Sequence, residues 1–106
     1  MTTFDNREQA FEGRFVHDQE MEFKAIARRN KLLGLWAAAK LGLAGEAAES
    51  YAQEVVRADF EEPGDSDVAR KLRNDLDRGQ VAVSDAELAK TMADLLVEAR
   101  RQVLEG

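Results

Sequence analysis

The side chains best suited to acid–base or nucleophilic chemistry are few and scattered in this sequence. His17 is the single histidine, there is no cysteine, and Ser50, Ser66 and Ser84 stand in no G-x-S-x-G context. One histidine without cysteine gives neither an H-E-x-x-H pattern nor a thiolate metal site. Carboxylates are abundant, but no pattern singles out an acid–base pair. The sequence therefore predicts a protein that is not an enzyme and that uses no metal or cofactor.

Residues suited to recognition are concentrated in the opening segment, TTFDNREQAFEGRFVHDQE. It contains Phe4, Phe11 and Phe15, three of the five phenylalanines, among acids and bases. At about 100° per residue, the three rings fall within a narrow arc of one helix face, whereas a core helix shows a wider apolar stripe. Gly13 costs about 1 kcal/mol of helix stability relative to alanine, and short isolated helices are marginal in water. We expect residues 1–19 to form a mobile, partly helical arm.

This arm is predicted to dock as a helix in a groove of a partner protein. The phenylalanines would be its apolar anchors, and the charged residues beside them would fix its orientation. The alternative is an arm that folds back onto the rest of the chain, but an exposed apolar stripe favours a contact with a partner. The candidate partner-binding residues are Phe4, Arg7, Glu8, Phe11, Glu12, Arg14 and Phe15.

His17 lies in the same segment and has two interpretations. Its ordinary pKa near 6.5 would suit a pH sensor, since a small shift moves it across physiological pH. An exposed histidine in a mobile arm also titrates without any consequence. We prefer the second interpretation and keep His17 as a candidate pH-sensing residue.

A basic set follows the arm. Lys24, Arg28 and Lys31 stand at i, i+4 and i+7, with Arg29 beside them. On a helix they would share one face, which could bind an anion or a nucleotide. They could equally form a solvated face, supported by a favourable i, i+4 pair between Glu20 and Lys24. The solvated face is the preferred interpretation.

Three further residues invite a functional interpretation but fit a structural one better. Asn30 falls inside an apolar stripe, where a buried amide usually finds a local partner or fixes the packing register. Trp36 and Tyr51 could clamp a base, but aromatic residues at helical spacing are more often part of a core.

Helices must position all of these residues. Ala, Leu, Glu and Arg are frequent, β-branched residues are sparse, and there is one proline, which favours an all-α fold over strands. A left-handed cap is expected at Gly42, a helix stop at Pro63, and a capping box from Ser84 to Glu87. The predicted fold is a four-helix bundle over residues 20–106 that follows the arm of residues 1–19. Its helices span about 18–41, 46–61, 66–78 and 85–104. The residues expected to face the core are Phe23, Ile26, Leu33, Ala37 and Leu41 from the first helix, Ala48, Tyr51, Ala52, Val55 and Val56 from the second, Val68, Leu72 and Leu76 from the third, and Leu88, Met92, Leu95, Ala99 and Val103 from the fourth.

Charge and hydropathy exclude several classes of partner. A net charge of −6 argues against nucleic acid. No stretch approaches the roughly 20 apolar residues that span a bilayer, and the N-terminus lacks the apolar core of a signal peptide. We expect a cytoplasmic protein, monomeric when free, without direct membrane insertion.

The chain resembles the zeta subunit family of alphaproteobacteria. The similarity covers nearly the whole chain, through FEGRFVHDQEMEFKAIARRNKLLGLWAAAKLG and YAQEVVRADFEEPGDSDVARKLRND, and is densest at FKAIARRNKLLGLWAA and VVRADFEEPG. This resemblance implies a four-helix bundle with a mobile N-terminal segment that inhibits the F-type ATP synthase. The segment would enter a catalytic α/β interface, near the central stalk, and block rotation in the hydrolytic direction.

Carried over to this sequence, the inhibitory segment is about Met1 to Gln19, which holds the three phenylalanines. The protein would then be peripheral to the inner membrane through the synthase. The alternative function is a nucleotide-responsive sensor or adaptor bundle without inhibitory activity. That alternative places the ligand on the basic face of Lys24, Arg28 and Lys31 and makes the arm dispensable.

Overall fold

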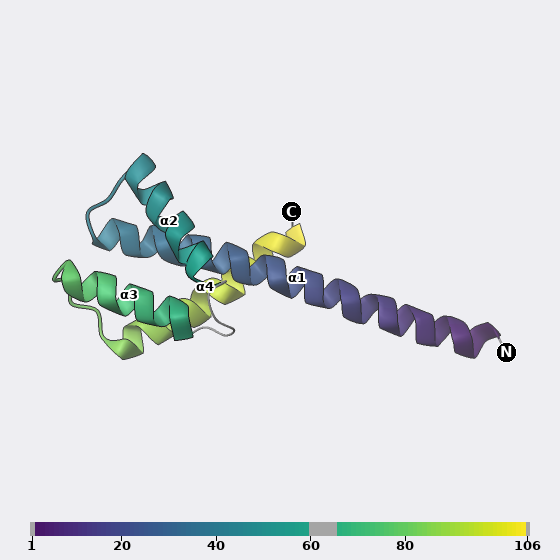
Figure 1. The fold of residues 1–106 in the computed structure, drawn as a ribbon. Coiled ribbons are helices and arrows are strands. Elements are labelled where there is room, and N and C mark those ends of the chain that lie inside the picture. The colour runs from purple at the N-terminus through teal and green to yellow at the C-terminus, as the bar shows by residue number, and fades with distance from the viewer. Residues whose placement is uncertain (1, 60–65, 106) are drawn as a thin grey trace.

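The computed structural model describes the backbone of residues 2–59 and 66–105, and the side chains of residues 19–59 and 67–105. Four helices make up this part of the chain, and it contains no strand: α1 (Thr2–Lys40), α2 (Glu46–Ala58), α3 (Ser66–Arg78) and α4 (Asp85–Glu105). The molecule is elongated, 65 × 25 × 22 Å, because α1 extends well past the other three helices (Figure 1). The all-α fold class, a four-helix bundle with a helical N-terminal arm, is confirmed.

Helix α1 joins two segments that the sequence analysis treats separately. The arm of residues 1–19 and the helix expected from about residue 18 form one helix of 39 residues, which passes through Gly13. The other helix bounds differ from prediction by at most three residues among those described. The predicted stop at Pro63 lies outside the described residues. The division between an arm and a domain near residue 19 stays a prediction.

The C-terminus of α1 is closed by two backbone hydrogen bonds. The Leu43 N–H donates to the Ala38 carbonyl at 2.8 Å, and the Gly42 N–H donates to the Ala39 carbonyl at 3.2 Å. Gly42 has a φ of 81°, the left-handed conformation that this Schellman motif requires. The predicted cap is confirmed, and it turns the chain so that α2 returns along α1.

Helix α3 ends in the same way, but glycine has a different role there. The Val81 N–H donates to the Leu76 carbonyl at 2.9 Å, and the left-handed residue is Gln80, with a φ of 59°. The preceding Gly79 is where another chain segment approaches. A Cβ at Gly79 would lie 2.5 Å from the Leu41 side chain. Gly79 therefore leaves room for the end of α1.

The start of α4 has the side-chain cap at Ser84 that is one half of the predicted capping box. The Glu87 N–H donates to Ser84 Oγ at 3.0 Å, and the Leu88 N–H donates to the Ser84 carbonyl at 3.0 Å. Val83 and Leu88 on either side are both buried in the core. The residues between α3 and α4, 81–84, form a loop, as expected.

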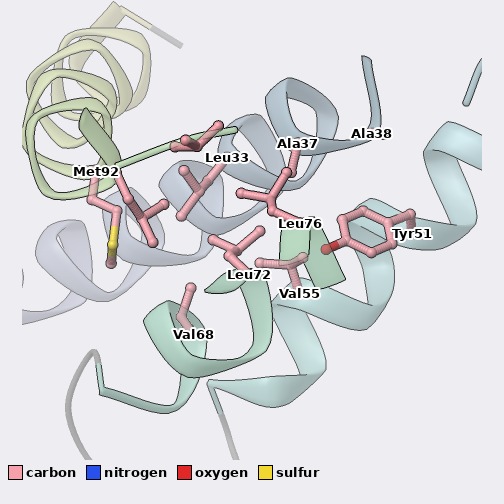
Figure 2. Close-up of a cluster of buried hydrophobic side chains, with 11 residues drawn as sticks. Leu33, Ala37, Ala38, Tyr51, Val55, Val68, Leu72, Leu76 and Met92 are labelled. Atoms are coloured by element: carbon pink, nitrogen blue, oxygen red, sulfur yellow. The ribbon is translucent and has the colours of Figure 1, made fainter. Parts of the chain in front are cut away.

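The core lies between the C-terminal half of α1 and the other three helices. Its buried side chains point toward one another in Figure 2, with Leu72 near the centre. The inward faces predicted for α2, α3 and α4 are confirmed at most positions. The buried cluster consists of Leu33, Ala37, Ala38, Tyr51, Val55, Val68, Leu72, Leu76, Val83, Leu88 and Met92.

One predicted core residue is wrong. Phe23 is 62% exposed, although it shares a helix face with buried residues further along α1. At this level of α1, Val56 in the last part of α2 and Asp59 just after it line one small cavity with Phe23. The helical period correctly gives the direction of Phe23, but most of its side chain stays exposed at this level of α1.

Candidate functional site

The arm residues are placed by the backbone of α1, and their side chains lie outside those described. Residues 2–18 are helical, so Phe4, Phe11 and Phe15 stand at helical spacing on the part of α1 that projects beyond the bundle (Figure 1). Their grouping on one face follows from the helical period of about 100° per residue. The roles of these phenylalanines, and of Arg7, Glu8, Glu12, Arg14 and His17, stay predictions.

The predicted basic set lies where α1 enters the bundle. Lys24, Arg28 and Lys31 line one open groove, as their i, i+4, i+7 spacing indicates. We call this groove, with a volume of ≈ 740 Å³, the root groove. Its walls come from three helices: Met21, Phe23, Lys24, Ala27, Arg28 and Lys31 of α1, Val56 of α2, and Gln102 and Val103 of α4.

Polar contacts hold α4 against α1 beside this groove. Arg100 Nη2 and Nε donate to the two carboxylate oxygens of Glu22 at 2.6 and 3.1 Å. The hydrogen bonds from Arg100 hold the pKa of Glu22 below its ordinary value, against a smaller opposing effect of burial. Further along, Arg28 Nη1 donates to Gln102 Oε1 at 3.1 Å. The end of α4 is therefore fixed to the part of α1 that borders the arm.

Arg29 does not belong to the exposed basic face. Its side chain is only 2% exposed, and Nε donates to Asn30 Oδ1 at 2.9 Å. Asn30 is 1% exposed, and its Oδ1 has the local partner expected for a buried amide, whereas its Nδ2 forms no hydrogen bond within the described part of the chain. Arg29 stands beside the basic set in the sequence, and its burial is not predicted from that spacing. Its position next to Asn30, inside an apolar stripe, is the available signal.

Tyr51 and Trp36 both pack in or against the core. Tyr51 is buried, and its hydroxyl donates to Asp75 Oδ2 at 2.8 Å. Burial, followed by the bond to the Asp75 carboxylate, raises the pKa of Tyr51. Trp36 packs against the core with Lys40 Nζ 5.2 Å from its ring centre. Both aromatic residues are structural.

A second groove, of ≈ 510 Å³, runs between α2 and α3. Its charged walls largely pair with each other: Lys71 Nζ lies 3.0 Å from Asp75 Oδ2 and 3.4 Å from Glu54 Oε2. Asp67, buried at the start of α3, lies 3.4 Å from Arg70 Nη1. These mutual ion pairs leave the second groove without the uniform charge of the root groove.

The described residues offer little else on which chemistry could be built. They contain no cluster of three or more His, Cys, Asp or Glu side chains arranged to hold a metal ion. None of the helices combines the length and the hydropathy needed to cross a membrane over the described residues. The root groove and the projecting half of α1 are two surfaces suited to recognition.

Comparison with known proteins agrees with the architecture and assigns the family. A solved structure, determined by solution NMR, is 48% identical to this chain and has a TM-score of 0.72. The match covers 80% of this chain and 96% of that one. No curated protein gives a significant match. The model of the family described as ATPase inhibitor subunit zeta matches residues 1–102, which includes both the arm and the bundle, and the chain belongs to that family.

Proposed function

We propose that this protein inhibits ATP hydrolysis by the F-type ATP synthase, and that its arm is the inhibitory element. The arm, about residues 1–19, would insert as a helix into a catalytic α/β interface, near the central stalk. Membership of an ATPase inhibitor family supports an inhibitory, non-catalytic role. The observation that carries the choice of the arm is the continuity of α1, whose first half projects beyond the bundle (Figure 1).

The physical basis is an anchored helix that carries apolar residues into a cleft. Residues 2–18 of α1 reach about 25 Å at 1.5 Å per residue, while the second half of the same helix is held in the core by residues such as Leu33 and Ala37. Burying a phenylalanine contributes roughly 1.5–3 kcal/mol. Three such anchors would make binding strong enough to oppose an opening of the interface. The charged residues Arg7, Glu8, Glu12 and Arg14 would fix the orientation.

Inhibition then follows from the cycle of the partner. If hydrolysis requires the catalytic interface to open and close as the central stalk turns, a helix bound to both walls holds the interface in one state. The protein supplies no reacting group in this mechanism. It acts by stabilising one conformation of the partner, by an amount equal to its differential affinity for that conformation. The bound protein would sit in the cytoplasm, peripheral to the inner membrane.

The test is a titration of ATP hydrolysis by the catalytic sector of the cognate synthase with the full-length chain. Replacing Phe4, Phe11 and Phe15 together with alanine is expected to weaken inhibition by more than about 100-fold, since three buried anchors are lost. The matched control replaces two exposed apolar residues of α4, Val97 and Leu104, with alanine. That variant should inhibit as the unmodified chain does, and thermal melts should show that both variants keep the bundle folded.

An equally potent triple variant would exclude the arm as the inhibitory element. The alternative, a nucleotide-responsive bundle, is favoured by one observation: Lys24, Arg28 and Lys31 line one groove. It predicts that adding ATP shifts the NMR signals of these three residues at micromolar to millimolar concentration. It also predicts that the triple alanine variant keeps its function.

A further inference from the structure

The root groove is lined by both basic and apolar side chains. Lys24 and Lys31 are exposed, and neither forms an ion pair with any other residue in the described part of the chain. Arg28 is exposed as well, and its contact is with the neutral amide of Gln102. Among the described residues, no carboxylate forms an ion pair with any of these three cations, in a protein whose net charge is −6.

The apolar part of the groove suits a helix. Its lining includes Ala27, a small residue that lets another helix approach α1 closely, and interaxial distances of about 8–10 Å are typical of such packing. Phe23, Val56 and Val103 supply apolar surface on its sides. From Met21 to Lys31 the groove follows α1 for about 15 Å, the length of nearly three helical turns. An amphipathic helix of about ten residues would fill it.

The position of the groove relates it to the arm. Both belong to α1, so a protein that binds the arm comes within reach of the first bundle residues at once. The ion pair between Glu22 and Arg100 holds the end of α4 beside this junction. The surface next to the arm is therefore shaped by packed helices.

We propose that the root groove binds an acidic amphipathic helix of the same protein that the arm inhibits. Carboxylates of that helix would pair with Lys24, Arg28 and Lys31, and its apolar face would lie on Ala27. This proposal rests on the proposed function, which it extends by a second contact with the partner. The groove contact would hold the bundle in one orientation and keep the arm at a high effective concentration at its own site.

The first test removes two groove charges from the full-length chain, in the variant Lys24→Gln/Lys31→Gln. Half-maximal inhibition of ATP hydrolysis by the catalytic sector is expected to need about 5- to 30-fold more of this variant at low salt. The difference should shrink toward unity at high salt, because salt screens exposed charges. The matched control, Arg57→Gln/Arg78→Gln, removes the same charge at the groove between α2 and α3 and should inhibit within about 2-fold of the unmodified chain.

The second test identifies what lies on the groove. Because the sequence has no cysteine, Ala27→Cys creates a single attachment point for a short photo-crosslinker in the root groove. Irradiation in the complex should attach this position to an acidic helix of the partner, whereas Ser50→Cys, exposed on α2, should give no such adduct. Adducts with the arm of the same chain would show fold-back and overturn the proposal.

The outcomes separate the two proposals. If the unmodified chain inhibits and Lys24→Gln/Lys31→Gln inhibits equally at every salt concentration, the groove proposal fails while the inhibitory function stands. An adduct with a non-acidic segment of the partner would also overturn the groove proposal. If the unmodified chain neither inhibits nor binds the catalytic sector, both proposals fail together.

Discussion

The two halves of α1 form one helix but owe their stability to different sources. In the second half, Ala25, Leu33, Ala37 and Ala38 are at most 1% exposed, so packing against α2 and α4 determines the structure. The first half projects beyond those helices (Figure 1). An isolated helix of that length is marginal in water. The helical order of the first half must therefore come from the packed half that it continues, or from a partner. A segment that gains order from a partner is suited to docking.

Two glycines, one in each half of α1, allow the sources of stability of the two halves to be tested separately. Gly34 lies in the packed half, where a Cβ would be 2.6 Å from the Ala52 Cα and 3.2 Å from Val55 Cγ2. Because the obstacle is the backbone of α2, Gly34→Ala should lower the free energy of unfolding by about 1–3 kcal/mol, despite the better helix propensity of alanine. Urea denaturation followed by circular dichroism measures this change.

The control for Gly34→Ala is Ala39→Gly, an exposed position of the same helix where only propensity changes, by about 1 kcal/mol. A stabilised Gly34→Ala variant would show that α2 moves away at little cost. The close contact of the two helices would then be unnecessary for the fold.

Gly13 lies in the first half of α1, where replacing glycine with alanine is expected to raise stability and not to lower it. No tertiary contact is expected to oppose a side chain there in the free protein, so Gly13→Ala should gain about 1 kcal/mol of helix stability. Far-ultraviolet circular dichroism should show more helix, and inhibition of ATP hydrolysis should tighten about 5-fold, because less order is lost on docking. Weaker inhibition would mean that the partner approaches α1 closely at Gly13, and that the glycine is required for binding.

How much of the fold the sequence predicts depends on whether a feature is set by adjacent residues or by the packing of distant helices. The period of apolar residues gives the inward faces of α2, α3 and α4, and short-range signals give the cap at Gly42 and the start at Ser84, because each depends on a few adjacent residues. The exposure of Phe23 could not be predicted in this way, since it depends on how distant helices pack against α1. The burial of Arg29 likewise depends on how the helices cross.

The candidate sites follow the same logic. The spacing of Lys24, Arg28 and Lys31 correctly groups them on one face, which is a local property of a helix. The groove that they line also needs Val56 and Val103, which come from distant parts of the chain. The pattern of three phenylalanines in the arm predicts a contact, and the identity of the surface that receives it is a property of the partner, not of this sequence.

The smallest expected effect concerns the junction between the halves, where Glu22 and Arg100 join α1 to α4. Both side chains are about half exposed, and pairs of this kind contribute about 0.5 kcal/mol. We therefore expect Glu22→Gln to speed hydrogen exchange of the amides of residues 19–24 about 2-fold at neutral pH. Glu98→Gln, which removes a pair with Arg101 inside α4, should leave those amides unchanged.

The lowered pKa of Glu22 determines how the stabilisation by this ion pair changes with pH. Arg100 holds the pKa of Glu22 below the ordinary value of 4.5, so the folded state favours the ionised carboxylate. The stabilisation is complete above pH 4.5 and is lost as pH falls through the lowered pKa of the folded state. The unmodified chain and Glu22→Gln, compared at each pH by hydrogen exchange, should converge in that acidic range. If Glu22→Gln leaves exchange at residues 19–24 unchanged at pH 7, apolar packing at residues such as Ala25 sets the boundary between the two halves of α1. The ion pair with α4 then contributes nothing to the order of this segment.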